Sequence, residues 1–152
     1  MAADIPRRTL VVANRTAGTR LLLEEVARRA RERPTRFTLL VPRAPRSRRG
    51  ALSDEWTLER ALVLLERAAR APVEGYLATG EDPFDSVRRA LGGGGFDDVI
   101  ISTLSTRRSE WLRRDLPRRV RRLGVPMTVI TAAEDAEAEP TAAIVGSGIG
   151  SR

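Results

Sequence analysis

The residues of this chain best suited to binding an anion follow its short apolar runs. They are Ala13 and Asn14, Val41 and Arg43, Gly80, Ser102, Thr103, Ser105 and Arg107, with Asp115 further on. Small residues let backbone N–H groups approach a ligand, hydroxyls donate hydrogen bonds, and guanidinium groups bind phosphate through two N–H donors at once. We therefore predict that these residues line a nucleotide- or anion-binding crevice.

Catalytic chemistry has few candidates in the same sequence. The chain has no His and no Cys, which excludes thiolate nucleophiles, Ser–His pairs and Cys/His zinc sites. The hydroxyl residues after Ile101 have no evident base, and Asp82 precedes Pro83 as a helix-capping residue does. We expect no enzymatic activity, no catalytic residue and no metal site.

Asp115 bears on whether a phosphate can bind in this crevice. It precedes Leu116 and Pro117, so we predict that its carboxylate caps the following helix and accepts the N–H groups that a phosphate would otherwise take. Four arginines are near it in sequence and either offset its charge or pair with it: Arg107, Arg108, Arg113 and Arg114.

The elements that position these residues alternate along the chain. Apolar, β-branched runs predict strands at residues 9–13, 37–41, 73–79, 99–102 and 127–131. Helical periodicity predicts helices over residues 22–30, from about Asp54 to Ala71, from Asp82 to the Gly92–Gly95 run, and over residues 111–123. Strands alternating with helices predict an α/β fold with a parallel sheet, whose ligands bind beyond the carboxyl ends of the strands.

The same periodicity predicts the core. We expect six strand residues to be buried: Leu10, Val12, Leu39, Val41, Ile100 and Val129. The stripe formed by Leu58, Leu62 and Leu65 has helical spacing and should cover the sheet. Residues 42–53, which include Arg43, Arg46, Arg48 and Arg49, are predicted to form a long loop.

Length and charge limit the class of protein. The 152 residues suit one domain, which we place at residues 1–132, followed by a tail at residues 133–152 that is acidic and then glycine-rich and that we expect to be flexible. All 27 basic residues are Arg, and the net charge is +7; such a composition is typical of GC-rich genomes. Without an apolar run of about 18 residues or an apolar signal segment, we expect a cytoplasmic protein and no membrane partner.

The order of elements and several edge residues resemble the universal stress protein family. The resemblance covers Thr9 to Thr131 and includes Ala13-Asn14 at the end of the first strand, Gly80-Glu81-Asp82-Pro83 after the third and Val125-Pro126 before the last. It implies a three-layer, Rossmann-like α/β sandwich with five parallel strands ordered 3-2-1-4-5. It also implies a regulatory or ligand-sensing function, ATP or another adenine nucleotide as ligand, and a homodimer formed through the last strand, from Val125 to Thr131.

The family's ATP-binding members carry Gly-x2-Gly-x9-Gly-Ser/Thr after the fourth strand. At matching spacing this chain has Ser102, Ser105 and Asp115-Leu116, so the three glycines and the hydroxyl residue are all replaced. Glycine lets backbone N–H groups approach phosphates closely. We therefore do not expect ATP to bind in the family's usual manner.

Two other functions remain as alternatives. Residues 107–122 contain eight arginines and superficially resemble a helix-turn-helix of a nucleic-acid-binding protein. Their apolar positions are needed for the core, however, and aromatic residues for stacking on bases are only 4% of the chain, which makes nucleic acid an unfavoured partner. A nucleotide-dependent hydrolase or transferase on the same fold would need a Walker-type or metal–carboxylate site, and no such motif is present in the sequence.

Overall fold

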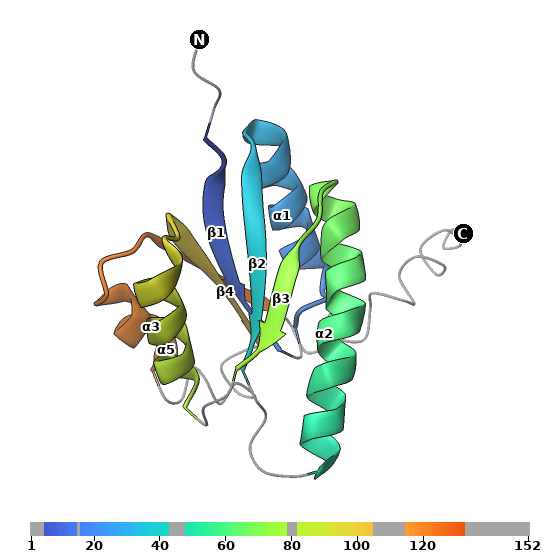
Figure 1. Cartoon of the computed structure of the whole chain (residues 1–152), viewed down its shortest axis with the longest axis vertical. Helices are drawn as coiled ribbons and strands as arrows, with labels where there is room; N and C mark the ends of the chain where they lie inside the picture. The colour runs from blue at the N-terminus through green and yellow to red at the C-terminus, as the bar shows by residue number, and fades with distance from the viewer. Residues whose placement is uncertain (1–4, 15, 43–47, 79–81, 105–114, 133–152) are drawn as a thin grey trace.

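The computed structural model describes residues 5–14, 16–42, 48–78, 82–104 and 115–132 (Figure 1). Its strands are β1 (Arg7–Val12), β2 (Thr35–Val41), β3 (Glu74–Leu77), β4 (Asp98–Leu104) and β5 (Met127–Ala132). They form one parallel sheet in the order β3-β2-β1-β4-β5. The predicted fold class and strand order are confirmed.

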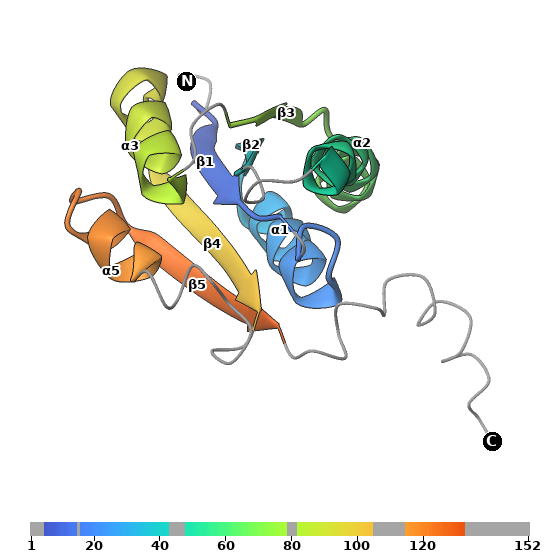
Figure 2. The same ribbon diagram turned by 90° about the horizontal axis from the view of Figure 1, so that it is seen from below.

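Helices cover both faces of the sheet. They are α1 (Arg20–Glu32), α2 (Arg48–Ala69), α3 (Pro83–Gly94) and α5 (Leu116–Arg121). Figure 2 shows α1 and α2 on one face and α3 and α5 on the other. No helix in the described part of the chain is both long and apolar enough to cross a membrane.

Alternating strand residues fill two separate cores. Val11, Leu39 and Ile100 pack with residues of α1 and α2, whereas Leu10 and Val12 pack with residues of α3 and α5. This alternation arises because successive side chains of a strand point to opposite faces. The result is the three-layer arrangement.

Five of the six predicted core residues are confirmed. Leu10, Val12, Leu39, Val41 and Ile100 are all 0% exposed. The prediction for Val129 is wrong: it is only half-buried, because β5 is the last strand of the sheet and has a neighbouring strand on one side only.

The predicted stripe on α2 does cover the sheet. Leu65 is fully buried, and Leu58 and Leu62 pack partly buried against the same core. A Cβ at Gly75 of β3 would lie 2.7 Å from Leu62 Cδ2 and 2.9 Å from Leu58 Cδ1. The glycine therefore permits the close approach of α2 to β3.

The predicted start of α2 is wrong by six residues. The helix begins at Arg48 rather than near Asp54, so residues 48–53 are not part of the expected long loop. Arg, Ala and Leu are favourable in helices, and here they outweigh the glycine at position 50. Arg43 and Arg46 lie outside the described residues.

The ends of the shorter helices follow local sequence. Asp82 caps α3, because its carboxylate accepts a hydrogen bond from the Phe84 N–H at 3.0 Å and Pro83 opens the helix. Gly95, in the left-handed region at φ 67°, ends it. Both features agree with the sequence prediction. Of the predicted 111–123 helical region the structure describes α5, and the predicted tail lies outside the described residues.

Candidate functional site

The carboxyl ends of the strands form one edge of the sheet, here named the carboxyl edge, at the lower end of the strands in Figure 1. After β1 the chain enters α1 on one face, and after β4 it continues to α5 on the other face. The carboxyl ends of these neighbouring strands therefore form a topological switch point, the usual place for a ligand in such sheets.

The segment after β1 is joined to β4 by a pair of hydroxyls. Ser102 Oγ donates to Thr16 Oγ1 at 2.7 Å, and Thr16 Oγ1 donates to the Ser102 carbonyl at 2.9 Å. Thr19 Oγ1 in turn donates to the Thr16 carbonyl at 3.0 Å. All three side chains are buried, so the predicted ligand contact Ser102 uses its hydroxyl hydrogen to hold the loop.

The other described strand-end residues form the floor of this edge. Asn14 is half-buried, and its side-chain amide donates to the Pro42 carbonyl at 2.6 Å, which ties the end of β1 to the end of β2. Ala13 and Val41 are fully buried. Their side chains could make apolar contacts with a ligand but cannot form hydrogen bonds with it.

Two buried hydroxyls near this edge have no partner. Thr103 Oγ1 and Ser86 Oγ make no hydrogen bond with any described residue, although their residues are only 2% and 5% exposed. Thr103 shares a face with Ile101, which packs toward α3 and α5. A buried hydroxyl that lacks a partner costs about 1–3 kcal/mol, so these two positions differ from the paired Ser102 and Thr16.

Asp115 lies at the expected N-cap position of α5 but does not cap it. Its side chain makes no capping hydrogen bond, and its backbone is left-handed at φ 59° and ψ 34°. A capping residue normally has extended dihedrals, and the left-handed backbone points this carboxylate elsewhere. Oδ2 lies 3.6 Å from Arg118 Nη1, and the Asp115 side chain is 54% exposed. The capping prediction is therefore wrong, although the position keeps a backbone typical of glycine.

Another cation near this edge is already engaged. The Arg119 guanidinium lies 4.2 Å from the centre of the Phe84 ring and 3.5 Å from Asp82 Oδ2. The remaining predicted site residues, Arg43, Gly80, Ser105 and Arg107, lie outside the described residues. The described part of the chain contains no group of three or more residues that could hold a metal ion.

Sequence reasoning missed Thr16 and Ser86. Thr16 is two residues beyond Asn14, and this proximity to a strand end was the available signal. Ser86 lies inside the first turns of α3, where nothing in the sequence distinguishes a buried hydroxyl from an exposed one.

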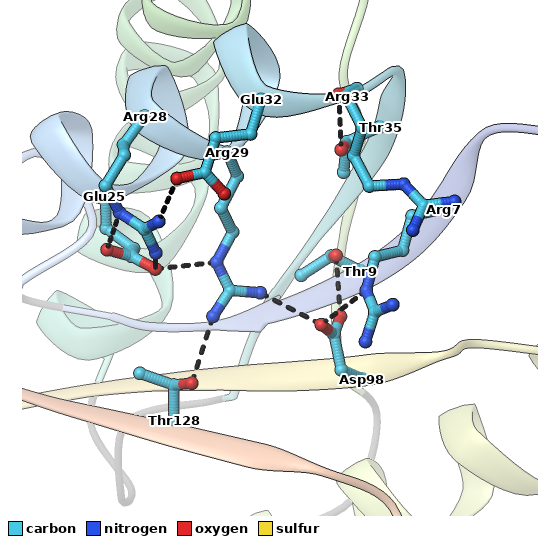
Figure 3. A network of polar contacts seen from close by, with 10 residues as sticks. All are labelled: Arg7, Thr9, Glu25, Arg28, Arg29, Glu32, Arg33, Thr35, Asp98 and Thr128. Carbon is cyan, nitrogen blue, oxygen red and sulfur yellow. Dashed lines mark hydrogen bonds and ion pairs between the residues drawn. The ribbon is translucent and has the colours of Figure 1, made fainter.

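A second polar cluster lies at the opposite edge, where the strands begin, here named the amino edge (Figure 3). Asp98 of β4 is at its centre: Oδ1 accepts from Thr9 Oγ1 at 2.6 Å, and Oδ2 accepts from Arg7 Nε at 2.9 Å and Arg29 Nη1 at 3.0 Å. Arg29 extends from α1 and also donates to Thr128 Oγ1 of β5 at 2.9 Å. One guanidinium thus joins α1, β4 and β5.

Glu25 completes this cluster on α1. It accepts hydrogen bonds from Arg28 and from Arg29 Nε, the latter at 2.6 Å. Burial raises the pKa of Glu25, but the hydrogen bonds from the two arginines outweigh burial and hold that pKa below its ordinary value of 4.5. The amino edge is therefore an ion cluster that stabilises the fold.

Solved structures of known proteins share this architecture. A universal stress protein from Archaeoglobus fulgidus matches with a TM-score of 0.59 at 17% identity, over 84% of this chain and 93% of that chain. The universal stress protein from the same organism in complex with dAMP matches with a TM-score of 0.57 at 17% identity, over 84% of this chain and 97% of that chain. A universal stress protein in complex with cAMP matches with a TM-score of 0.53 at 14% identity, over 86% of this chain and 98% of that chain.

No family model matches the chain, and no curated protein matches it. The likeness is therefore one of structure. The chain has the fold of the universal stress proteins, as the sequence resemblance implied.

Proposed function

We propose that this chain, which has the universal stress protein fold, is a regulatory domain that senses an adenine nucleotide of low charge at its carboxyl edge. The observation that carries the proposal is the buried Thr103 hydroxyl at the end of β4, which has no partner among the described residues and lies beside the switch point between β1 and β4. Structures of the same fold contain dAMP and cAMP, which supports an adenine nucleotide as the ligand class.

The preference for low charge comes from Asp115. Its half-exposed carboxylate precedes α5, and among the described residues it forms an ion pair with Arg118, at 3.6 Å. A triphosphate brings more negative charge to this edge than a monophosphate, so its repulsion from Asp115 is larger. We infer that AMP or a cyclic monophosphate binds more tightly than ATP.

Sensing rather than turnover is supported by the roles of the described hydroxyls. Ser102 Oγ donates to Thr16 Oγ1, and Thr16 Oγ1 donates to the Ser102 backbone carbonyl, and the chain has no His to activate either hydroxyl. A hydroxyl engaged in this way, without a base, is a poor nucleophile.

Titration calorimetry with AMP, cAMP and ATP tests this function. We expect the two monophosphates to bind at least about tenfold more tightly than ATP, a difference of about 1.4 kcal/mol, with no release of phosphate from ATP on prolonged incubation. The Asp115→Asn variant should reduce that difference. Tighter binding of ATP than of AMP by the unaltered protein would overturn the proposal.

We also propose a homodimer formed through β5. Within the described sheet β5 pairs only with β4, and its apolar residues Met127, Val129 and Ile130 remain half-buried. Pairing with a second copy about a two-fold axis would satisfy both edges together. Sedimentation equilibrium should give twice the 16.7 kDa mass of the chain, and a monomer mass at micromolar concentration would contradict the dimer.

A further inference from the structure

The amino edge carries a set of arginines that the Asp98 cluster does not use, here named the amino-edge arginines. They are Arg31, Arg33, Arg36, Arg67, Arg70, Arg121 and Arg122, all exposed. They come from the ends of α1, α2 and α5 and from the start of β2, which reach the same edge because each helix runs back to where the next strand begins. Figure 1 shows the ends of α1 and α2 beside the upper ends of the strands.

None of these seven side chains forms an ion pair with a described residue, and most of the described acids nearby have other partners. Glu32 pairs with Arg28, and Asp98 and Glu25 pair within the cluster. Glu66 accepts from the Val73 N–H at 3.1 Å, and Asp97 accepts from the Arg8 N–H at 2.8 Å. Glu66 and Asp97 keep their negative charges, and Glu74 at the start of β3 adds an exposed one. The dipole of each helix end offsets about half a charge more, so a part of the positive charge of these seven arginines is uncompensated.

Three arginines of this edge occupy positions that local structure disfavours. Arg8 and Arg36 are direct partners in the parallel register of β1 and β2, and both are exposed; like charges at such positions repel. Arg70 has a left-handed backbone at φ 58°, where a glycine would be less strained. A bound polyanion would relieve the repulsion between Arg8 and Arg36 and so gain binding energy.

The dimensions of the edge match a nucleic-acid duplex. Neighbouring strands lie about 4.8 Å apart, so the edge from β3 to β5 spans about 19 Å. A duplex carries one phosphate charge for about every 1.7 Å of its axis. Several guanidinium groups on the edge can therefore lie near phosphates at once, and each such group can bind a phosphate through two N–H donors.

Other polyanionic partners suit the edge less well. Phe96 is the aromatic ring at this edge, and the Arg8 guanidinium covers it at 5.2 Å from the ring centre, so it is not free to stack on single-stranded bases. Among the large apolar side chains that the structure describes as exposed, only Ile5 and Leu123 flank this edge. Two such side chains are few for insertion into a membrane surface.

We propose that the amino edge binds the phosphate backbone of duplex nucleic acid without sequence specificity. This function is separate from nucleotide sensing, because the two sites lie at opposite ends of the strands. It also differs from a helix-turn-helix at residues 107–122. Residues 107–122 were disfavoured as a nucleic-acid-binding segment because their apolar positions are needed for the core. The amino-edge arginines are exposed residues of several elements, so this argument does not apply to them.

Two variants of equal charge test the proposal. The first changes Arg31, Arg36 and Arg121 to Gln at the amino edge. The second changes Arg20, Arg60 and Arg88 to Gln elsewhere on the helices. Fluorescence anisotropy with a labelled 20-base-pair duplex, measured over a salt series, gives the affinity of each, and urea unfolding confirms that both variants fold.

The unaltered protein should show a slope of log Kobs against log salt of about −4 to −6, which corresponds to about five or six phosphate contacts. The amino-edge variant should lose about 2.7 of this slope and at least about 30-fold in affinity near 0.1 M salt, whereas the control variant should change less than threefold. Saturating AMP should not compete. Equal losses in both variants, or tighter binding to phosphatidylserine vesicles than to duplex, would overturn the proposal.

Discussion

At the amino edge both carboxylate oxygens of Asp98 are saturated with donors from β1 and α1. At the carboxyl edge the hydroxyl of Thr103 on the same strand is buried and unpartnered, and Asp115 has a left-handed backbone without capping α5. The two ends of β4 thus hold polar groups of similar burial in opposite states. At one end the buried groups are paired, and at the other the Thr103 hydroxyl has no partner among the described residues.

The contrast separates polar groups that stabilise a fold from those that bind. Buried polar groups are normally paired. Local sequence preference, packing and hydrogen bonding are expected to agree with one another except at functional sites. The amino edge meets this rule in its buried layer and departs from it only on its surface, through the amino-edge arginines. The carboxyl edge departs from it in the buried layer itself. Substitutions at the two edges should therefore change the free energy of unfolding by different amounts and, in some cases, in opposite directions.

The largest effect is expected for Asp98→Asn. This change removes the charge that Arg7 and Arg29 contact at 2.9 and 3.0 Å, and the Asp98 side chain is only 9% exposed. Removal of one partner from a buried ion pair costs about 3–5 kcal/mol. Urea unfolding at neutral pH should show that the free energy of unfolding falls by this amount.

The neighbouring Asp97→Asn is its matched control. Asp97 is exposed and accepts one hydrogen bond from the Arg8 N–H, so we expect a loss below about 1 kcal/mol. Equal losses for the two variants would mean that the Asp98 cluster contributes nothing beyond an ordinary surface contact.

A matched pair of valine substitutions should give changes of opposite sign. Thr9→Val removes the hydroxyl that donates to Asp98 at 2.6 Å and should lower the free energy of unfolding by about 1–2 kcal/mol. Thr103→Val removes a buried hydroxyl that has no described partner and should raise it by about 1 kcal/mol. Destabilisation by both would show that Thr103 is paired.

Much of the fold could be predicted from the sequence because it depends on local patterns. Strands such as β1 and β2 are apolar and β-branched, and the Asp82-Pro83 pair marks the start of α3. The error at Val129 has a different cause: whether a strand lies at an edge depends on strand order, which periodicity does not contain. The late predicted start of α2 arose because its first residues are cationic and resemble a loop.

The site was less predictable because its contacts are long-range. Thr16 and Ser102 pair across 86 positions of the chain, and Arg8 meets Arg36 only through the register of two strands. The sequence located the strand ends to within two residues, since β3 ends at Leu77 rather than at residue 79 and β4 at Leu104 rather than at residue 102, but it did not show which hydroxyls pair there. For Asp115, the following Leu-Pro indicates a cap, whereas the left-handed backbone depends on how the chain enters α5.

Glu25→Gln tests the amino edge through its dependence on pH. Because the folded pKa of Glu25 lies below 4.5, its carboxylate contributes stability that is fully present above the unfolded pKa and is lost as the pH falls through the folded pKa. The variant should be less stable by about 1 kcal/mol at pH 7, and the difference should disappear in acid. Urea unfolding from pH 7 to pH 2.5 measures it; a difference that does not change with pH would contradict the assigned role of the charge.

Asp115→Gly should have the smallest effect and should sharpen the contrast at the carboxyl edge. The backbone at φ 59° suits glycine, and no capping hydrogen bond is lost. The salt bridge to Arg118 is long and exposed at 3.6 Å, so its loss costs little. We expect a gain of about 0.5–1 kcal/mol relative to the unaltered protein, since a non-glycine residue pays about that much for a left-handed backbone.

Asp115→Ala is the control for this substitution, because it removes the same carboxylate but keeps a Cβ. Thermal melts with and without ATP should show that both variants gain ATP affinity, whereas only the glycine variant gains stability without ligand. If alanine stabilised as much as glycine, charge rather than backbone strain would account for the effect. If neither variant bound ATP more tightly, the carboxylate of Asp115 would not be what limits the charge of the ligand.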